Sequence, residues 1–223
     1  MTVATTGLLN LRAQKAKAIR GLYCITAEMY SGGRDNIAVV REMLLGGAKI
    51  VQYREKDMPM LKQYRQCLEL RRMTADVGAL LIIDDHIDLA LAVGADGVHI
   101  GQEDLPIEKA RETAGDDMLI GLSTHSPEQA LDAVTRGADY IGVGPIFETH
   151  TKSDVCASVG LSYLDYIVQN INLPFVVIGG IKLSNIGTVL EHGAACVALV
   201  TGIVGADDIS GTVSDLTKKI VTI

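Results

Sequence analysis

Short hydrophobic runs alternate with longer segments of helical periodicity along nearly the whole chain. The runs have the length and the aliphatic character of buried strands, and the segments between them have apolar residues at the three- and four-residue spacing of amphipathic helices. The predicted strands span residues 21–26, 49–54, 79–84, 97–101, 118–122, 139–144, 174–178 and 195–200. The predicted helices span residues 35–46, 60–77, 86–93, 106–114, 126–136, 160–170, 183–192 and 207–221. Eight such strand–helix units in 223 residues predict a parallel α/β fold of TIM-barrel size.

Turn residues mark the ends of these segments. Ser126-Pro127-Glu128 has the order of a helix N-cap, a first-turn proline and a first-turn acid. Glycines stand at or just past the predicted helix ends, where a left-handed backbone favours them: Gly47, Gly78, Gly94, Gly115, Gly137 and Gly193. An additional helical pattern over residues 8–19 precedes the first strand, and we expect it to plug or cover the lower end of the barrel. No linker or change of composition interrupts the chain, so we expect one domain over residues 1–223.

Composition and charge narrow the class of protein. Hydrophobic residues make up 48% of the chain but aromatic residues only 4%, which predicts an aliphatic core of the kind found in parallel sheets. A net charge of −7 argues against broad binding to nucleic acid or to an anionic membrane. The four cysteines are scattered and the N-terminus lacks the pattern of a signal peptide, so we expect a cytoplasmic protein with reduced thiols. Whether the chain forms a homo-oligomer is left open.

Polar residues stand where the predicted strands end, and in a TIM barrel this end forms the active site. Arg54 and Lys56 follow the second strand and share a side with Gln52, two residues earlier. Two cations on one side suit an anion, and arginine matches the geometry of phosphate. The alternative is a surface cluster of ion pairs with Glu55 and Asp57. The position at a strand end favours an anion site.

Carboxylates from two neighbouring strand ends form the second candidate group. Asp84 and Asp85 close the third strand, and Asp104 lies just past the fourth. A small number of carboxylates, together with phosphate as a further source of oxygen ligands, suits Mg²⁺, because this ion keeps several of its bound waters. The alternative for Asp85 and Asp104 is capping of the helices that follow them, and the two interpretations are compatible.

Later strand ends add hydroxyl groups and backbone amides. Ser123 follows the fifth strand and could bind a phosphate oxygen, with a cap or turn role as an equal alternative. Gly179-Gly180 follows the seventh strand and Val200-Thr201-Gly202 ends the eighth. TIM barrels often bind phosphate with these two loops, although ordinary tight turns have the same composition. His99 and His125 receive no chemical role from the sequence alone.

Several motifs in a fixed order resemble thiamine phosphate synthases, a family of TIM barrels. They are Gln52-Tyr53-Arg54-Glu55-Lys56, Leu81-Ile82-Ile83-Asp84-Asp85, the segment from Gly97 to Asp104 and the segment from Gly144 to Lys152. The similarity runs in order from about Leu22 to about Ile203. It implies a transferase that joins a hydroxymethylpyrimidine diphosphate to a thiazole phosphate, or to its carboxylate, and releases diphosphate, with CO₂ as a further product when the thiazole is carboxylated.

The resemblance also implies roles for individual residues. Arg54, Lys56 and Lys152 would be catalytic through their contacts with diphosphate, and Mg²⁺ would bind Asp85 and Asp104. The implied substrate-binding residues are Gln52, Asp84, Ser123, Thr149, Thr151, Gly180, Val200 and Thr201. These groups suit a dissociative, carbocation-like reaction in which positive charge stabilises the leaving group and no protein nucleophile takes part.

Three positions depart from the usual family pattern. Asp84 stands where the family has Asn, Glu148 where Pro is common, and Thr201 where Ser is usual. A carboxylate near diphosphate repels it unless the carboxylate is protonated, paired with a cation or bound to a metal. Two alternatives therefore stay open: a thiazole tautomerase of the same barrel, which would not need the full diphosphate and Mg²⁺ set, and a non-catalytic sensor of a phosphorylated ligand, which Asp84 alone supports.

Overall fold

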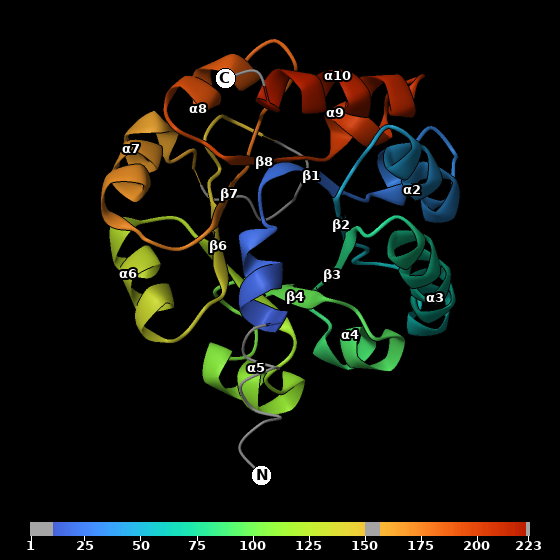
Figure 1. Cartoon of the computed structure of the whole chain (residues 1–223), viewed down its shortest axis with the longest axis horizontal. Coiled ribbons are helices and arrows are strands. Elements are labelled where there is room, and N and C mark those ends of the chain that lie inside the picture. The colour runs from blue at the N-terminus through green and yellow to red at the C-terminus, as the bar shows by residue number, and fades with distance from the viewer. Residues whose placement is uncertain (1–10, 150–156, 222–223) are drawn as a thin grey trace.

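A closed barrel of parallel strands forms the centre of the molecule (Figure 1). The computed structural model describes residues 11–149 and 157–221. Its strands are β1 (Gly21–Ile25), β2 (Ile50–Tyr53), β3 (Leu80–Asp84), β4 (Gly97–Ile100), β5 (Leu119–Thr124), β6 (Tyr140–Val143), β7 (Phe175–Val177) and β8 (Cys196–Leu199). Each strand pairs in parallel with the next in chain order, and β8 closes the barrel by pairing with β1. The predicted TIM barrel is confirmed.

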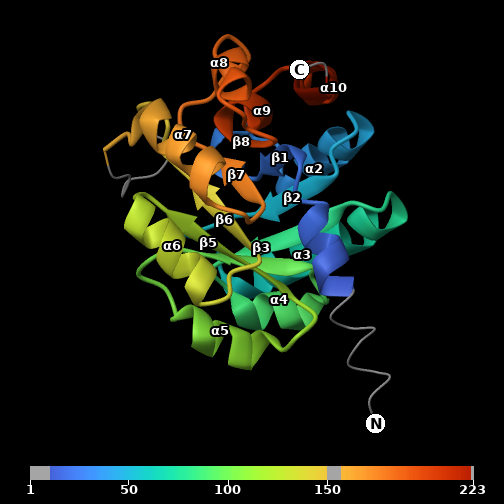
Figure 2. The same ribbon diagram turned by 60° about the vertical axis from the view of Figure 1, so that its left-hand side comes forward.

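Helices surround the barrel on all sides (Figures 1 and 2). The long ones are α2 (Asn36–Leu45), α3 (Met60–Asp76), α4 (Ile87–Val93), α5 (Ile107–Ala114), α6 (Pro127–Thr135), α7 (Gly160–Asn170), α8 (Ile186–Glu191) and α10 (Ile209–Val221). Each of them lies within a predicted helix. Two short elements were not predicted, the 3-10 helix η1 (Glu28–Tyr30) and the four-residue helix α9 (Thr201–Val204), because so few residues carry no periodicity. No helix in the described ranges has the length and apolar character needed to cross a membrane.

The predicted helix boundaries have the expected local geometry. Ser126 caps α6, and its hydroxyl accepts a hydrogen bond from the Gln129 backbone N–H at 3.3 Å. The glycines predicted at helix ends all have a positive φ: Gly47, Gly78, Gly94, Gly115, Gly137 and Gly193. Because this backbone conformation costs other residues energy, these glycines end the helices and return the chain to the next strand.

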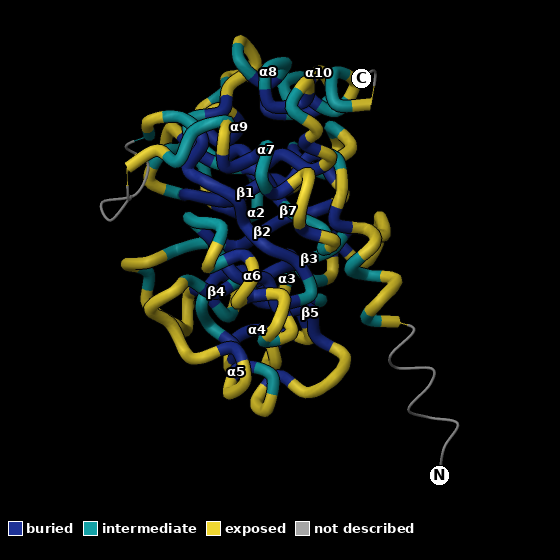
Figure 3. Tube along the Cα trace, turned by 90° about the vertical axis from the view of Figure 1, so that its left-hand side faces the viewer, coloured by how far each residue is buried: buried dark blue, intermediate teal, exposed yellow. Residues whose placement is uncertain are grey.

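Two hydrophobic cores lie on opposite sides of the strand layer. The larger one packs the outer faces of the strands against the helices, and the smaller one fills the barrel with residues such as Tyr23, Ile82, Leu119 and Tyr140. The strands are accordingly the most buried part of the chain (Figure 3). Because the strands are buried on both faces, they appear in the sequence as continuous apolar runs.

Residues 11–17 form a helix that lies across the N-terminal end of the barrel (Figures 1 and 2). Lys15 Nζ lies 3.2 Å from Asp96 Oδ1, and Arg12 Nε lies 3.3 Å from Asp139 Oδ1. Asp96 also accepts a hydrogen bond from the Leu81 backbone N–H at 3.0 Å, and Asp139 accepts one from the Ile120 backbone N–H at 2.8 Å. The predicted cover is confirmed for these residues, and residues 8–10 lie outside the described part of the chain.

Candidate active site

A cavity of about 760 Å³ opens at the C-terminal ends of the strands. Residues of every strand from β1 to β8 line it, so the barrel itself positions the site. The predicted site residues that line it are Gln52, Arg54, Asp84, Ser123, Thr149, Gly180, Val200 and Thr201. The structure thus brings together residues that are up to about 150 positions apart in the sequence, as the barrel topology predicts.

A group of opposite charges lies on the β2 and β3 side of this cavity. Arg54 Nε lies 3.4 Å from Asp84 Oδ2, Lys56 Nζ lies 3.5 Å from the same oxygen, and Lys56 also forms an ion pair with Asp85. Asp84 is only 7% exposed. The cations therefore pair with the end of the neighbouring strand, and not with Glu55 and Asp57 beside them in the sequence.

Electrostatics keep Lys56 charged. Its partial burial alone would lower the pKa of Lys56, but the nearby carboxylates Asp84 and Asp85 outweigh this effect and raise that pKa above its ordinary value of 10.5. The buried Nε of Arg54 makes no hydrogen bond, so its contact with Asp84 is one of charge alone. A ligand with a larger negative charge than Asp84 and Asp85 together can therefore compete with these aspartates for the two cations.

Backbone contacts fix the place of Arg54. The hydroxyl of Thr26, which is fully buried, accepts a hydrogen bond from the Arg54 N–H at 2.9 Å. Thr26 itself donates its backbone N–H to the Gln52 carbonyl at 2.9 Å. These bonds continue the pairing of β1 with β2 beyond the last strand residues. The backbone of Arg54 is therefore held in place at the end of the strand.

A chain of hydrogen bonds forms the floor of the cavity. Gln52 Nε2 donates to the Tyr23 hydroxyl at 3.1 Å, and that hydroxyl lies 3.1 Å from the Tyr140 hydroxyl. His99 links Tyr140 to Ser123, with its two ring nitrogens 3.1 and 2.9 Å from their hydroxyl oxygens. Burial raises the pKa of both tyrosines, so their hydroxyls stay protonated. The cavity floor can therefore offer both donors and acceptors to a polar ring.

Sequence reasoning missed Tyr23, Tyr140 and His99 as parts of this floor. From the sequence alone, tyrosines inside strands are interpreted as ordinary core residues, and so is a single histidine inside a strand. One signal was available, namely Gly121 in β5, where a Cβ would overlap the Tyr140 ring and the His99 imidazole. A glycine inside a strand often marks such a close approach. The alternative cap role for Ser123 is wrong, because Ser123 lies in β5 and Ser126 caps the helix that follows.

The two predicted metal ligands lie at adjacent strand ends. Asp85 follows β3 with a φ of 59°, and its N–H donates to the His99 carbonyl of β4 at 2.8 Å. Asp104 Oδ2 accepts the Gly101 N–H, just past β4, at 2.6 Å. Neither aspartate caps a helix, because α4 and α5 begin without any side-chain cap. In the described ranges, no three or more His, Cys, Asp or Glu side chains are grouped to bind a metal.

On the β7 and β8 side of the cavity, the loops that follow the two strands bring backbone groups to the lining. Gly179 and Gly180 have φ values of 107° and 62°, and a Cβ on Gly180 would lie 2.6 Å from the Glu148 carbonyl oxygen. The loops after β6 and β7 therefore touch. After the neighbouring strand β8, α9 begins at Thr201. Thr149 lies at the cavity edge, whereas Thr151 and Lys152 lie outside the described residues.

Comparisons with known proteins point to one family. The family model described as thiamine monophosphate synthase matches residues 22–203. A thiamine-phosphate synthase of Pelotomaculum thermopropionicum is 58% identical over 195 residues, which cover 87% of this chain and 89% of that protein. One of Dictyoglomus turgidum is 52% identical over 202 residues, which cover 91% of this chain and 89% of that protein.

A solved structure agrees with these relatives. The structure of a thiamine phosphate pyrophosphorylase from Pyrococcus furiosus has a TM-score of 0.85 and 38% sequence identity to this chain. The match covers 96% of this chain and 98% of that one. The chain therefore belongs to the thiamine monophosphate synthase family.

Proposed function

We propose that the protein is a thiamine-phosphate synthase, a transferase that joins a pyrimidine diphosphate to a thiazole phosphate or its carboxylate. The observation that carries the proposal is the placement of Arg54 and Lys56 in and beside the same cavity as Gly180 and Thr201. One side of the cavity offers two cations, and the other offers strand ends rich in backbone amides. Two substrates that each carry phosphate can bind with their reacting ends facing each other.

The diphosphate would bind on the β2 and β3 side. Arg54 and Lys56, together with Lys152, would take up the negative charge that develops as the bond from the methylene carbon to oxygen breaks. The electron-rich aminopyrimidine carries the positive charge left on that carbon, and the thiazole nitrogen then attacks it. Gln52 and Ser123, which the hydrogen-bond chain of the floor orients, would help to bind the pyrimidine diphosphate.

No protein nucleophile is needed for this reaction, and the described cysteines do not suit that role. Burial raises the pKa of Cys24 and of Cys67 to about 12, and it raises the pKa of Cys196 as well. All three thiols are buried and stay protonated near neutral pH. Positioning and electrostatics therefore carry the proposed catalysis.

Asp85 and Asp104 would hold Mg²⁺. Their carboxylates flank the adjacent ends of β3 and β4, and such hard oxygen donors in small number suit a metal that takes further oxygens from water and substrate. When bound, Mg²⁺ neutralises charge on the diphosphate oxygens. Asp85 pairs with Lys56, so the metal ligand and the cation lie on one side of the cavity.

The thiazole phosphate would bind on the β6 to β8 side. Thr149 and Thr151 would contact the thiazole, and Gly180, Val200 and Thr201 would bind its phosphate through backbone and hydroxyl groups. The positive φ of Gly180 and the start of α9 at Thr201 support this assignment. We also propose that the protein acts on these small molecules in the cytoplasm, without nucleic acid or membrane partners.

A two-substrate assay tests the proposal. The purified protein is incubated with the pyrimidine diphosphate, the thiazole phosphate and Mg²⁺, and the release of diphosphate and of thiamine phosphate is measured. Release of both products that depends on both substrates is the expected result. Isomerisation of the thiazole carboxylate without coupling would instead indicate a tautomerase, and ligand binding without turnover would indicate a sensor.

A further inference from the structure

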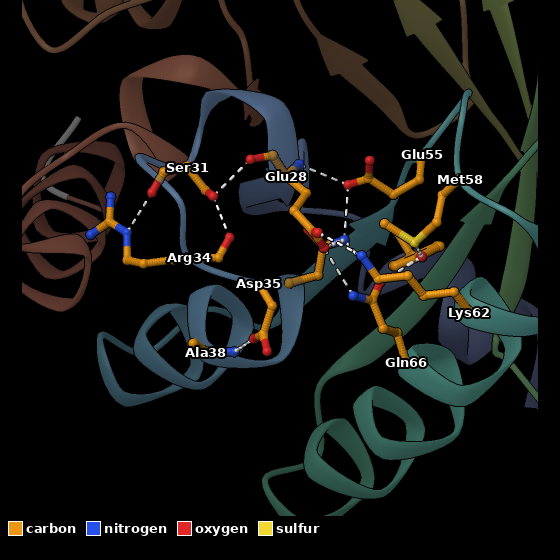
Figure 4. Close-up of polar contacts among 11 residues, drawn as sticks. Glu28, Ser31, Arg34, Asp35, Ala38, Glu55, Met58, Lys62 and Gln66 are labelled. Atoms are coloured by element: carbon orange, nitrogen blue, oxygen red, sulfur yellow. Dashed lines mark hydrogen bonds and ion pairs between the residues drawn. The ribbon is translucent and has the colours of Figure 1, made fainter.

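A polar cluster whose residues do not line the cavity is not used by the proposed chemistry as described above. It joins Glu28 of η1, Asn36 of α2, Glu55 after β2 and Gln66 of α3 (Figure 4). Asn36 is fully buried and Gln66 is 5% exposed. Burial of polar groups costs free energy unless they are hydrogen-bonded, so the hydrogen bonds of this cluster hold its side chains in place, although Asn36 Oδ1 is buried without a partner.

Glu55 turns its side chain into this cluster, away from the cavity. Its neighbours in the sequence, Arg54 and Lys56, both pair with Asp84 at the barrel rim, as alternation along an extended segment requires. Glu55 Oε1 accepts hydrogen bonds from the Glu28 backbone N–H at 2.8 Å and from Asn36 Nδ2 at 2.9 Å. The loop that carries the two cations is therefore attached at its middle residue.

The partners of Glu55 are themselves fixed. The Glu28 carboxylate accepts from Lys62 Nζ at 2.8 Å and from Gln66 Nε2 at 2.9 Å, which ties η1 to α3 (Figure 4). Burial alone would raise the pKa of Glu28, but these two partners outweigh it and lower that pKa, so the carboxylate stays charged. Gln66 Oε1 in turn accepts from Asn36 Nδ2 at 3.0 Å and from the Tyr53 hydroxyl at 2.7 Å.

We propose that Glu55 is a positioning residue, which acts on the reaction through Arg54 and Lys56 by fixing the backbone between them. The inference rests on the proposed function, because it assumes that these cations bind diphosphate. Both groups that contact Glu55 Oε1 are N–H donors, so an uncharged oxygen acceptor in the same place can make the same two contacts. This requirement distinguishes Glu55 from a residue that merely tunes the electrostatic potential of the rim.

Three variants separate these roles. Glu55→Ala removes the acceptor, Glu55→Gln keeps it without the charge, and Asp57→Ala removes a charge from an exposed side chain of the same loop as a matched control. Binding of inorganic diphosphate with Mg²⁺ is measured by calorimetry, and KM is measured for each substrate. Glu55→Ala should weaken diphosphate binding by about 10-fold and raise KM for the pyrimidine diphosphate equally, because it loses two hydrogen bonds. Glu55→Gln and Asp57→Ala should stay within about twofold of the parent protein, and KM for the thiazole phosphate should not change.

The opposite results overturn the inference. Unchanged diphosphate binding in folded Glu55→Ala would make the cluster purely structural, and equal losses in Glu55→Gln and Glu55→Ala would make charge the cause. If Glu55→Ala does not fold, Asn36→Ala replaces it, because this change removes one donor and leaves Glu55 in place; about threefold weaker binding supports the inference and unchanged binding overturns it. Calorimetry with inorganic diphosphate needs no turnover, so a parent protein that binds diphosphate without making thiamine phosphate refutes the proposed function and leaves this test intact.

Discussion

Asp84 sets the charge that a diphosphate meets in the cavity, and Asp84→Asn removes that charge while it keeps the shape of the side chain. Asp84 Oδ2 lies 3.4 Å from Arg54 Nε and 3.5 Å from Lys56 Nζ. A phosphate oxygen on the far side of the same guanidinium would lie roughly 7 Å from Asp84, where two unit charges repel by about 1 to 2 kcal/mol at an effective dielectric constant of about 20 to 40. Relief of this repulsion corresponds to an affinity about 5- to 30-fold higher.

The assay is steady-state turnover with saturating thiazole phosphate and excess Mg²⁺. KM for the pyrimidine diphosphate should fall in Asp84→Asn by about the factor given above, and kcat should change less than KM. The difference should depend only weakly on salt, because Asp84 is 7% exposed and ions screen buried charges much less than exposed ones. A rise in KM, or a loss of turnover, would refute the reasoning, since it would mean that the Asp84 carboxylate itself binds the metal or a substrate. Asp85→Asn serves as the contrast, because it should raise the concentration of Mg²⁺ that the enzyme requires.

The remaining predictions concern charge, metal, pH and packing. Arg54→Ala should lower kcat by about 100-fold or more in the two-substrate assay, because it removes a cation from the leaving group, and near-normal turnover would contradict that role. Removal of Mg²⁺ with EDTA should abolish turnover and leave the melting temperature nearly unchanged, because the barrel folds around apolar cores; a large fall in melting temperature would point to a structural metal. Glu28→Gln should lower the free energy of unfolding near pH 7, and this difference should vanish as the pH falls below 4.5 through the lowered pKa of Glu28; urea titrations that give the same difference at both pH values would disprove it. Gly121→Ala should destabilise the barrel by about 1 to 3 kcal/mol in the same measurement, because its Cβ would overlap the Tyr140 ring, and a loss well below this range would show that the ring moves easily.

The barrel could be predicted because its signals are local. A strand that is buried on both faces is a continuous apolar run, and a glycine at a helix end is required by the backbone alone. The short elements η1 and α9 carry no such signal, since they are held by contacts with other loops. Arg34, for example, donates from Nη2 to the carbonyl of Val204 at 2.9 Å, across 170 residues of sequence.

The site could be predicted only in part, for a related reason. The topology places Arg54, Asp84 and Thr201 at one end of the barrel, so a list of rim residues follows from the order of strands and helices. The ion-pair partner of each rim residue does not follow from this order of strands and helices. Arg54 pairs with Asp84 from the next strand and not with its neighbour Glu55, because neighbours along an extended segment point to opposite sides.

The carboxylates Asp96 and Asp139 lie at the opposite end of the barrel from the cavity, and each one joins a cation of the N-terminal helix to the start of a strand. Arg71 and Arg111 of the outer helices pair with the same two aspartates. Changes in these ion pairs would act on the free energy of unfolding while the cavity keeps its geometry, as is typical of this end of a TIM barrel. We therefore expect that substitutions at this lower end change thermal stability without changing substrate affinity, which makes it the place to adapt the fold to a new temperature.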